Sequence, residues 1–447
     1  MPPTRRYFIE TFGCQMNVND SEKVAGLLQA DGYEPAAAQE EADFVFINTC
    51  AVREKAAEKL FSSLGRLKQL KAAKPELKVG VGGCVAQLQG TSILERAPHV
   101  DVLVGTHNIA RVPDLAREPT YGETRVDLDR RADTFTIPDE AVAHTSSVRA
   151  YVTAIEGCNH VCSFCVVPRT RGPEVCRAPE AIVAEVESLV ARGFAEVMLL
   201  GQTVNAYQHS GLDFAALLAR VHAVRGLERL RFTTSHPSEV TPGMAASFRD
   251  LDRLCPYLHL PVQSGSDRVL DAMRRGYTRG LYLEKIAMLR AARPDLAISS
   301  DIITGYPGET EAEFEETVSL VDTVGFDGLF VFTYSPRPGT TALRERDDVP
   351  EAEKKRRLHV LNNRQQRAQR VRNEALVGTT QRVLVDHVEG PRLSGRTPHF
   401  RIVHFDGPEE WKGRAVDVEI THGGPNSLVG HAVQSVSEND RVGILLS

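Results

Sequence analysis

In roughly the first 110 residues, short apolar runs typical of strands alternate with stretches of helical spacing. After the second apolar run, Ala56, Leu60 and Leu64 recur at intervals of four, and Leu67 follows three residues later. This spacing places the four side chains on one face of a helix. Alternating strands and helices predict a parallel sheet covered by helices, which we place at residues 5–121. The predicted strands are RRYFIETFGC, ADFVFINTC, LKVGVGGC and VDVLVGT.

A polar, proline-bearing stretch over residues 117–147 interrupts this alternation and is expected to be a linker. Six further strand-like runs follow between residues 149 and 339, each succeeded by a helix or loop. Six consecutive βα units predict a partial (βα)6 TIM-like barrel with its helices outside, as the core of a domain over residues 144–373. The predicted strands are RAYVTAIEGC, EVMLLGQTVN, RLRFTTSHP, YLHLPVQSG, AISSDIITGYP and GLFVFTYSPRPGT.

Polar residues gather at the downstream ends of these six strands. In α/β barrels this end holds the active site, although such residues also serve as loop caps and turn formers. The set comprises Gln202, Asn205, Ser235, His236, Gln263, Ser264, Asp301, Ser335 and Arg337.

The last part of the chain changes character twice. Residues 354–372 form a helical stretch with eight Lys or Arg and no acidic residue, which is either a solvated helix face or an RNA contact. From Leu376 onward, the runs QRVLVDHV, RIVHFDG, RAVDVEITH and RVGILLS alternate with turns. They predict a small β-barrel over residues 376–440. The fold class is therefore α/β, with an N-terminal parallel domain, a partial barrel and a small C-terminal β-barrel.

Composition is that of a globular protein: 447 residues, 42% hydrophobic, 25% charged, with a net charge of −6. The sequence has no run of eighteen apolar residues, and its N-terminus lacks the apolar segment of a secretory signal. We therefore expect a cytoplasmic protein without a membrane span. Cytoplasmic thiols stay reduced, so the eight cysteines favour metal or cluster ligation over disulfides. The acidic net charge means that nucleic-acid binding must rest on local charge.

The segment CNHVCSFC holds Cys158, Cys162 and Cys165 directly after a predicted barrel strand. A [4Fe–4S] cluster normally takes four thiolates. Three thiolates leave one iron open for an outside ligand, as catalytic zinc sites keep one open position. In radical chemistry that ligand is the amino and carboxylate end of S-adenosylmethionine (SAM). The three cysteines are thus candidate catalytic residues.

A zinc site is the alternative for this segment, with His160 or Cys176 as the fourth ligand. It is less favoured, because zinc-binding cysteine pairs usually recur as CxxC. Cys176 and Cys255 have no partner at ligand spacing and are expected to be ordinary buried thiols.

Cys14, Cys50 and Cys84 each end a predicted strand of the first domain, 36 and 34 residues apart. Ligands of open α/β sheets collect at the carboxyl ends of strands, so these cysteines should converge. A second cluster is favoured over three buried thiols. Gly13 and Gly83 precede two of them, and glycine permits close approach of the backbone to a cofactor.

Over nearly its whole length, the chain resembles the bacterial tRNA methylthiotransferases of the radical SAM superfamily. This resemblance implies that Cys14, Cys50 and Cys84 hold an auxiliary [4Fe–4S] cluster, that residues 158–165 hold the SAM-cleaving [4Fe–4S] cluster, and that the last domain is an RNA-binding TRAM module. The matching strings are TFGCQMNVNDSEKV, INTCAVREKA, GCVAQ, CNHVCSFCVVPRTRGPE, LLGQTVNAY, TTSHP, HLPVQSGSDRVLDAMRRGYT, SDIITGYPGETE and TYSPRPGT.

Within the family, Gln15, Met16 and Asn17 resemble the branch that acts on prenylated adenosine beside the anticodon, as does SHP at residues 235–237. The branch that modifies ribosomal protein S12 usually shows Pro-Lys-Asn after the first cysteine, and the threonylcarbamoyl-adenosine branch shows Lys-x-Asn. These two targets are the alternatives with the same chemistry. A zinc-stabilised RNA-binding protein without catalysis is the alternative from another class.

The chain also departs from the family pattern. Cys176 stands where the family generally has serine, and His399 and Phe400 stand where asparagines are expected. From Leu376 onward, seven Lys or Arg face nine Asp or Glu, which favours the basic stretch before the barrel as the RNA contact.

The resemblance implies methylthiolation of carbon 2 of N6-(dimethylallyl)adenosine at tRNA position 37. One SAM molecule is cleaved to methionine and a 5′-deoxyadenosyl radical, which takes hydrogen from carbon 2. Sulfur from the auxiliary cluster, methylated by a second SAM, joins that carbon. The implied partners are the tRNA anticodon stem-loop, an electron donor such as flavodoxin or ferredoxin, and proteins that deliver sulfur or clusters. The candidate SAM-binding residues are Gly201, Gln202, Ser235, Gln263, Asp301 and Arg337.

Overall fold

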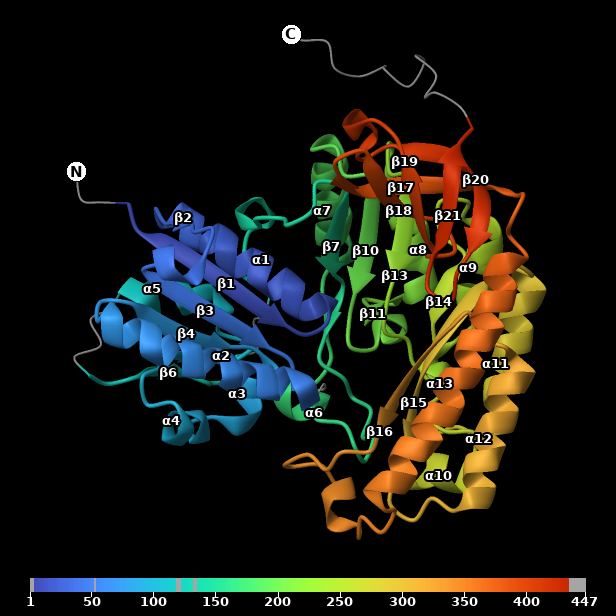
Figure 1. Cartoon of the computed structure of the whole chain (residues 1–447), viewed down its shortest axis with the longest axis horizontal. Coiled ribbons are helices and arrows are strands. Elements are labelled where there is room, and N and C mark those ends of the chain that lie inside the picture. The colour runs from blue at the N-terminus through green and yellow to red at the C-terminus, as the bar shows by residue number, and fades with distance from the viewer. Residues whose placement is uncertain (1–3, 52–53, 118–121, 132–134, 434–447) are drawn as a thin grey trace.

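The computed structural model describes residues 4–51, 54–117, 122–131 and 135–433. Figure 1 shows the N-terminal sheet in blue, the central strands and helices from green to orange, and the C-terminal barrel in red at one end of the central strands. Among the described residues, no helix is both long and apolar enough to cross a membrane.

The N-terminal domain is a six-stranded sheet in the order β2-β1-β3-β4-β5-β6, and every neighbouring pair is parallel. All four predicted strands are confirmed. The sheet also takes in β6, which lies within the expected linker and pairs with β5. Its strands are β1 (Arg6–Phe12), β2 (Glu34–Pro35), β3 (Phe44–Thr49), β4 (Lys78–Gly82), β5 (Val102–Val104) and β6 (Arg125–Asp127).

Helices cover this sheet through the apolar faces that the sequence predicted. Leu60, Leu64 and Leu67 are all buried within the second helix. Gly82 of β4 makes room for an aromatic ring, since an added Cβ would lie 2.4 Å from Cζ of Phe46. The helices are α1 (Gln15–Ala30), α2 (Glu54–Ala73), α3 (Cys84–Gln89), α4 (Ser92–Arg96) and α5 (Val112–Arg117).

The central domain contains the six predicted barrel strands in two three-stranded sheets, β13-β10-β7 and β14-β15-β16. Isolated bridges Leu230–Leu254 and Gln263–Ile302 continue the pairing between the strands. Among the described residues no pairing closes β16 onto β7, so the barrel is open along that side. The main strands are β7 (Arg149–Thr153), β10 (Glu196–Leu200), β13 (Arg229–Phe232), β14 (Tyr257–His259), β15 (Ala297–Thr304) and β16 (Gly328–Thr333).

The helices of the central domain lie outside these strands, and the largest apolar core fills the space between the two layers. Short strands lie beside the loops: β8 (Ile155–Glu156) pairs with β9 (Val175–Cys176), and β11 (Gln208–His209) pairs with β12 (Leu212–Asp213). The helices are α6 (Val167–Thr170), α7 (Pro179–Ala191), α8 (Phe214–His222), α9 (Pro242–Asp250), α10 (Asp267–Ala272), α11 (Arg279–Ala292) and α12 (Glu311–Val324).

Helix α13 (Glu351–Glu374) packs against β16 and leads into a closed barrel in the order β17-β18-β19-β21-β20. Three of the predicted runs are confirmed as β17, β19 and β20, whereas RVGILLS lies outside the described residues. The runs that form β18 and β21 were not predicted. The strands are β17 (Thr380–Glu389), β18 (Arg392–Arg396), β19 (Ile402–Asp406), β20 (Ala415–Gly423) and β21 (Leu428–Ala432).

The C-terminal barrel is fixed to the upstream ends of the central strands. Arg229 donates to the carbonyl oxygens of Arg396 at 2.6 Å and Arg382 at 3.0 Å. Arg231 donates to the carbonyls of Pro398 at 2.8 Å and Thr397 at 2.9 Å. Buried guanidinium groups on the central domain therefore bind loop and strand carbonyls of the small barrel.

Phe400 lies at the centre of this interface. Its ring stacks on Tyr257 with 4.8 Å between ring centroids, and the guanidiniums of Arg396 and Arg231 lie 4.5 and 4.9 Å from it. His399 beside it lies 3.1 Å from a carboxylate oxygen of Asp295. The two residues that depart from the family pattern thus join the domains.

Candidate active site: two groups of three cysteines

The loop that bears Cys158, Cys162 and Cys165, called the central loop here, begins at a tightly packed turn. Gly157 has a φ of 80°, and an added Cβ would lie 2.0 Å from the carbonyl oxygen of Pro173. Its N–H donates to Oε1 of Gln202 at 2.6 Å, and the N–H of Cys158 donates to the carbonyl of Gly172 at 3.1 Å. Gln202, a candidate SAM ligand, therefore holds the loop that bears the cysteines.

The three sulfurs of this loop each have a polar neighbour. Sγ of Cys158 lies 3.2 Å from Oγ1 of Thr203, and Sγ of Cys162 accepts from Arg275 at 3.2 Å. Burial is the main reason why the pKa of the Cys165 thiol is raised to about 12; the hydrogen bond from Val167 acts against this rise, and the charges of the other two cysteines contribute to it. Three thiolates on one short loop would repel one another, so a cationic metal centre suits this donor set.

The other three cysteines come together at one edge of the N-terminal sheet. Cys14 follows β1, Cys50 follows β3 and Cys84 follows β4, and these strands are neighbours. A hydrogen bond between the Cys14 and Cys50 side chains lowers the pKa of Cys14 to about 6, against the effect of burial. Burial raises the pKa of Cys84, and the nearby charge of Cys14 adds to that rise. The structure thus brings together the three cysteines that the strand pattern grouped.

The two glycines before these cysteines are also required for packing. An added Cβ on Gly13 would lie 2.3 Å from Oδ1 of Asn17, and one on Gly83 would lie 2.2 Å from Oδ1 of Asn48. Asn17 donates to Asn48 at 3.1 Å, and Asn48 donates back to the Asn17 carbonyl at 2.9 Å. The glycines therefore make room for a buried asparagine pair that ties α1 to β3, and their close approach to a cofactor stays a prediction.

Arg171 connects the two cysteine groups, and the sequence analysis did not identify it. Helix α6, directly after the central loop, packs on α3, which begins at Cys84. The guanidinium of Arg171 makes a buried two-pronged ion pair with Asp20 of α1, in which Nη1 lies 3.4 Å from Oδ1. It also hydrogen-bonds the Cys84 side chain, and Glu156 lies 4.0 Å away. One buried cation thus spans the domain boundary beside the second group.

Around the central loop, three buried polar atoms have no hydrogen-bond partner among the residues that the structure describes: Oγ of Ser235, Nε2 of His236 and Oε1 of Gln263. Buried polar groups normally have partners, so these atoms fit a polar ligand such as SAM. Backbone strain marks the same segments, since Thr234, Gln263 and Arg274 have φ values of 68°, 77° and 55°. Non-glycine residues in this region typically occur at functional sites.

The remaining candidate SAM ligands have partners of their own. Gly201 packs tightly, since an added Cβ would lie 2.4 Å from Ile155. Asp301 lies 3.5 Å from Nε2 of His259, and Arg337 donates to the carbonyl oxygen of Ala51 in the N-terminal domain. Their contact with SAM stays a prediction.

The two candidates for a fourth zinc ligand each have contacts of their own. The ring of His160 stacks on His236 with 3.8 Å between centroids and 15° between planes. Within the described part of the chain, these two histidines and Glu239 form a group in which one possible metal-ligand atom of each lies within 4.8 Å of the others. Glu239 lies 3.4 Å from Nε2 of His160. Sγ of Cys176 accepts from the N–H of Gln208 at 3.4 Å, and Cys255 is a buried thiol as expected.

The basic stretch of α13 is largely neutralised. Arg364 pairs with Asp322 at 2.6 Å, Arg370 with Glu374 at 3.0 Å, and Arg356 with Glu311 at 2.6 Å. In contrast, Arg274 and Arg344 line a pocket beside the central loop, and no ion pair of either is found among the described residues. Arg274 and Arg344 therefore offer accessible positive charge at this rim, whereas much of the charge of α13 is already paired.

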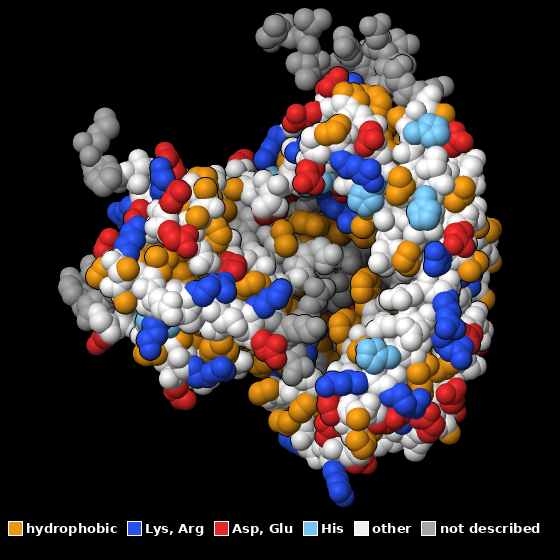
Figure 2. Space-filling view, in the orientation of Figure 1, with side chains coloured by type: hydrophobic (Ala, Val, Ile, Leu, Met, Phe, Trp, Pro, Cys, Tyr) orange, Lys and Arg blue, Asp and Glu red, His pale blue; other side chains and the backbone are white. Residues whose placement is uncertain are grey.

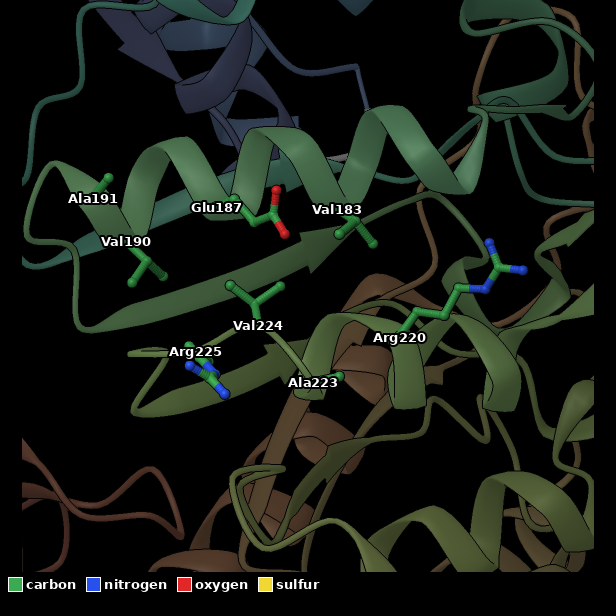
Figure 3. A pocket seen from close by; sticks show the side chains of 8 residues that line it. All are labelled: Val183, Glu187, Val190, Ala191, Arg220, Ala223, Val224 and Arg225. Atoms are coloured by element: carbon green, nitrogen blue, oxygen red, sulfur yellow. The ribbon is translucent and has the colours of Figure 1, made fainter.

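Two hollows of the surface differ in their relation to the cysteines. Figure 2 shows a wide hollow between the N-terminal domain and the central domain, with hydrophobic side chains on its walls. Figure 3 shows a smaller groove between α7 and α8, in the outer helix layer. Because helices cover the outside of the strands, the second groove lies apart from both cysteine groups. Its lining residues are Val183, Glu187, Val190, Ala191, Arg220, Ala223, Val224 and Arg225.

Three protein-family models match the chain: the uncharacterized protein family UPF0004 over residues 6–105, the radical SAM superfamily over residues 152–321 and the TRAM domain over residues 374–433. A solved structure of the radical SAM methyltransferase TsrM from Kitasatospora setae is 14% identical, with a TM-score of 0.57 over 76% of this chain and 74% of that chain. The cobalamin-dependent radical enzyme OxsB has a TM-score of 0.50 at 10% identity, over 76% of this chain and 54% of that chain. These likenesses show the fold.

Curated relatives are much more similar and match end to end. The tRNA-2-methylthio-N(6)-dimethylallyladenosine synthase of Geobacter metallireducens is 47% identical over 95% of this chain and 97% of its own length. The enzyme of that name from Chromobacterium violaceum is 49% identical over 97% of this chain and 100% of its own length. The chain therefore belongs to the family of the tRNA-2-methylthio-N(6)-dimethylallyladenosine synthases, with a radical SAM domain at its centre.

Proposed function

We propose that the protein transfers a methylthio group to carbon 2 of N6-(dimethylallyl)adenosine at position 37 of tRNA, by radical SAM chemistry. The observation that supports this most directly is the juxtaposition of two cysteine triplets. Arg171 follows the central triplet and hydrogen-bonds Cys84 of the other. A reaction that generates a radical and then adds sulfur needs two adjacent centres of this kind.

In this proposal, Cys158, Cys162 and Cys165 would hold the first [4Fe–4S] cluster, which supplies the electron for SAM cleavage and keeps one iron free for SAM. The protein places positive charge beside it, because the buried guanidinium of Arg275 donates to Cys162. Ser235, His236 and Gln263 supply the unpartnered polar atoms that would orient SAM. Gly201, Gln202, Asp301 and Arg337 remain candidates at the rim of the same site.

Cys14, Cys50 and Cys84 would hold the auxiliary [4Fe–4S] cluster, which supplies the sulfur. Arg171 offsets the negative charge of thiolates there, and Asp20 holds the guanidinium in place. Next to Cys14, Met16 packs against Met198 and Leu200 of the barrel wall. This apolar contact excludes water from the space beside the cysteines, which protects a radical from side reactions.

The TRAM barrel and the rim arginines Arg274 and Arg344 are the proposed tRNA contacts, with the anticodon stem-loop entering the hollow of Figure 2. Guanidinium groups bind phosphates well because of their planar array of donors. The reaction also requires a one-electron donor, such as flavodoxin or ferredoxin, and proteins that deliver sulfur or clusters. A tRNA substrate and reduced thiols place this reaction in the cytoplasm.

Reconstitution tests the function directly. The anaerobically reconstituted protein is incubated with SAM, a reductant and anticodon stem-loops that bear dimethylallyl, threonylcarbamoyl or no group, alongside purified S12. Mass spectrometry should find a 2-methylthio product only on the dimethylallyl loop. Turnover of the threonylcarbamoyl loop alone, or of S12 alone, would assign the chain to another branch. A preparation with zinc but no iron or acid-labile sulfide would favour a non-catalytic RNA-binding protein.

A further inference from the structure

Strand β16 exposes two aromatic rings. Phe330 is 53% exposed and Phe332 is 41% exposed, and within the described part of the chain they are the only aromatic residues among the exposed large hydrophobic side chains. Their neighbours Leu329 and Val331 point to the opposite face, where they pack against the core of the central domain. An exposed pair of aromatic side chains marks a surface for a binding partner.

The two rings belong to the inner face of the open barrel. Phe330 is paired with Asp301 and Phe332 with Ile303 on β15, and paired residues of neighbouring strands share a face. The ring of Phe330 lies edge-on to His259 of β14, with 6.0 Å between centroids. Because α13 packs on the outside of β16, the rings point away from the helix layer. The two rings thus form an aromatic wall of the open barrel, next to the polar side chains of Asp301 and His259.

The N-terminal domain covers the opposite side of the barrel. Asn19 of α1 donates to the carbonyl of Tyr151 at 3.3 Å and accepts from Oγ1 of Thr153 at 3.0 Å, both on β7. Met16 packs against two residues of β10. The N-terminal domain thus covers the β7 and β10 wall and leaves the β16 wall free. Figure 2 shows the hollow that remains.

We infer that Phe330 and Phe332 form the binding surface for the dimethylallyl-adenine of the tRNA substrate and so select the prenylated nucleoside. The inference rests on the proposed function and names the substrate-recognition surface of that site. An aromatic ring stacks on a purine base, and an apolar wall buries a branched five-carbon group. A threonylcarbamoyl group has a carboxylate instead, which this wall cannot solvate and which Asp301 repels.

Binding to anticodon stem-loops tests this inference without turnover. The reconstituted protein is titrated with fluorescent loops that bear dimethylallyl, threonylcarbamoyl or no group, and the ratio of the Kd values for the dimethylallyl and the bare loop is compared with that of F330A/F332A. The wild type should prefer the prenylated loop by about tenfold or more, given the apolar area of the group. The double variant should bind both loops equally, at the affinity of the bare loop.

Two control variants accompany this comparison. V371A removes an apolar side chain that is 65% exposed on α13, so it should keep the full preference. F332R retains a large side chain but adds a cation, and it should shift binding from the dimethylallyl loop towards the threonylcarbamoyl loop. This second variant tests the surface even where the double truncation disturbs the fold.

The outcomes separate this inference from the proposed function. If the wild type prefers and methylthiolates the prenylated loop while F330A/F332A and F332R keep its preference unchanged, the aromatic surface is not the selector and the function stands. If the wild type shows neither preference nor turnover on the prenylated loop, the function itself is wrong. Loss of preference in the variants, with SAM cleavage in the absence of RNA retained, supports the inference.

Discussion

Arg171 of the central domain and Asp20 of helix α1 form an ion pair in which both side chains are only 2% exposed. The pair joins two domains through residues that lie 151 positions apart in the sequence. Because Arg171 also reaches Cys84, the position of one cysteine group depends on the segment that follows the other. The distance between the two proposed clusters is thus set by a charged contact and not only by apolar packing.

Arg171→Met should leave Asp20 as a buried, unpaired charge. Loss of one partner of such a pair costs about 3–5 kcal/mol, so urea unfolding of the cluster-free protein should show a fall of that order. Arg169→Met changes an exposed arginine of helix α6, two residues before Arg171, and should have little effect. Arg171→Met combined with Asp20→Leu should recover part of the loss. A single variant as stable as the wild type would show that the pair does not couple the domains.

Replacement of Cys158, Cys162 or Cys165 by Ala should abolish reductive SAM cleavage, since each is one of only three proposed anchors of the open cluster. Chromatography of 5′-deoxyadenosine measures this directly. Cys176→Ala, outside both groups, should retain cleavage. Substantial 5′-deoxyadenosine from any of the three variants would refute the ligand assignment.

Replacement of Cys14, Cys50 and Cys84 by Ala should have a different effect. SAM cleavage should persist, because the central loop is intact, while the methylthio product disappears. Iron content should fall by about four atoms per chain if the lost centre is a [4Fe–4S] cluster. Unchanged iron and product in this triple variant would mean that the three residues are ordinary thiols.

Glu196 should give the domain interface a specific acid sensitivity. Burial by itself would raise its pKa, but Arg231 and Arg149 together lower the pKa to about 2. Because the folded pKa lies below the ordinary value of 4.5, the stabilisation is complete above pH 4.5 and is lost as the pH falls from 4.5 towards 2. Glu196→Gln should therefore lower the free energy of unfolding at pH 7, and the difference from wild type should shrink below pH 4.5.

Urea unfolding of both proteins between pH 7 and 3 measures this difference. Asp250→Asn, at an exposed ion pair with Arg249, serves as the control and should give a small difference at every pH. If the free energy of unfolding of Glu196→Gln differed from that of the wild type by the same amount at every pH, the pKa of the Glu196 carboxyl would not change on folding.

Neutralisation of Arg274 and Arg344 should weaken tRNA binding in a salt-dependent manner. Each lost phosphate contact should reduce the slope of log Kd against log salt by about 0.7–0.9. Arg364 and Arg370 already pair with Asp322 and Glu374, so their neutralisation should change the slope less. If neutralisation of Arg364 and Arg370 reduced the slope more than neutralisation of Arg274 and Arg344, helix α13 would be the main RNA contact instead.

The sequence predicted those parts of the structure that repeat along the chain. Cys14, Cys50 and Cys84 could be grouped because each follows a parallel strand, and the carboxyl ends of such strands meet at one edge. Likewise, the spacing of Leu60, Leu64 and Leu67 predicted their buried face. Such patterns involve residues close together in the sequence. The regular backbone of a strand or helix therefore fixes where each of their side chains lies.

Single contacts between domains could not be predicted in the same way. Arg171 lies in a segment with no periodic pattern, and its partner Asp20 lies on the polar part of another helix. The ion pairs of α13 could not be predicted for the same reason, because its acidic partners come from α12 and the end of α13 itself. Such pairings depend on how the elements pack, which composition does not reveal.

The seating of Phe400 between Tyr257 and two guanidiniums has a consequence for biosynthesis. The ribosome makes this residue after the whole central domain, so the upstream end of the open barrel stays uncapped until the C-terminal barrel has been made. Until then, Arg229 and Arg231 lack the carbonyl acceptors that the C-terminal barrel provides. A prematurely terminated chain would expose these arginines and an aromatic face to proteases and chaperones. The fold itself thereby distinguishes a chain that includes the C-terminal barrel from one that lacks it.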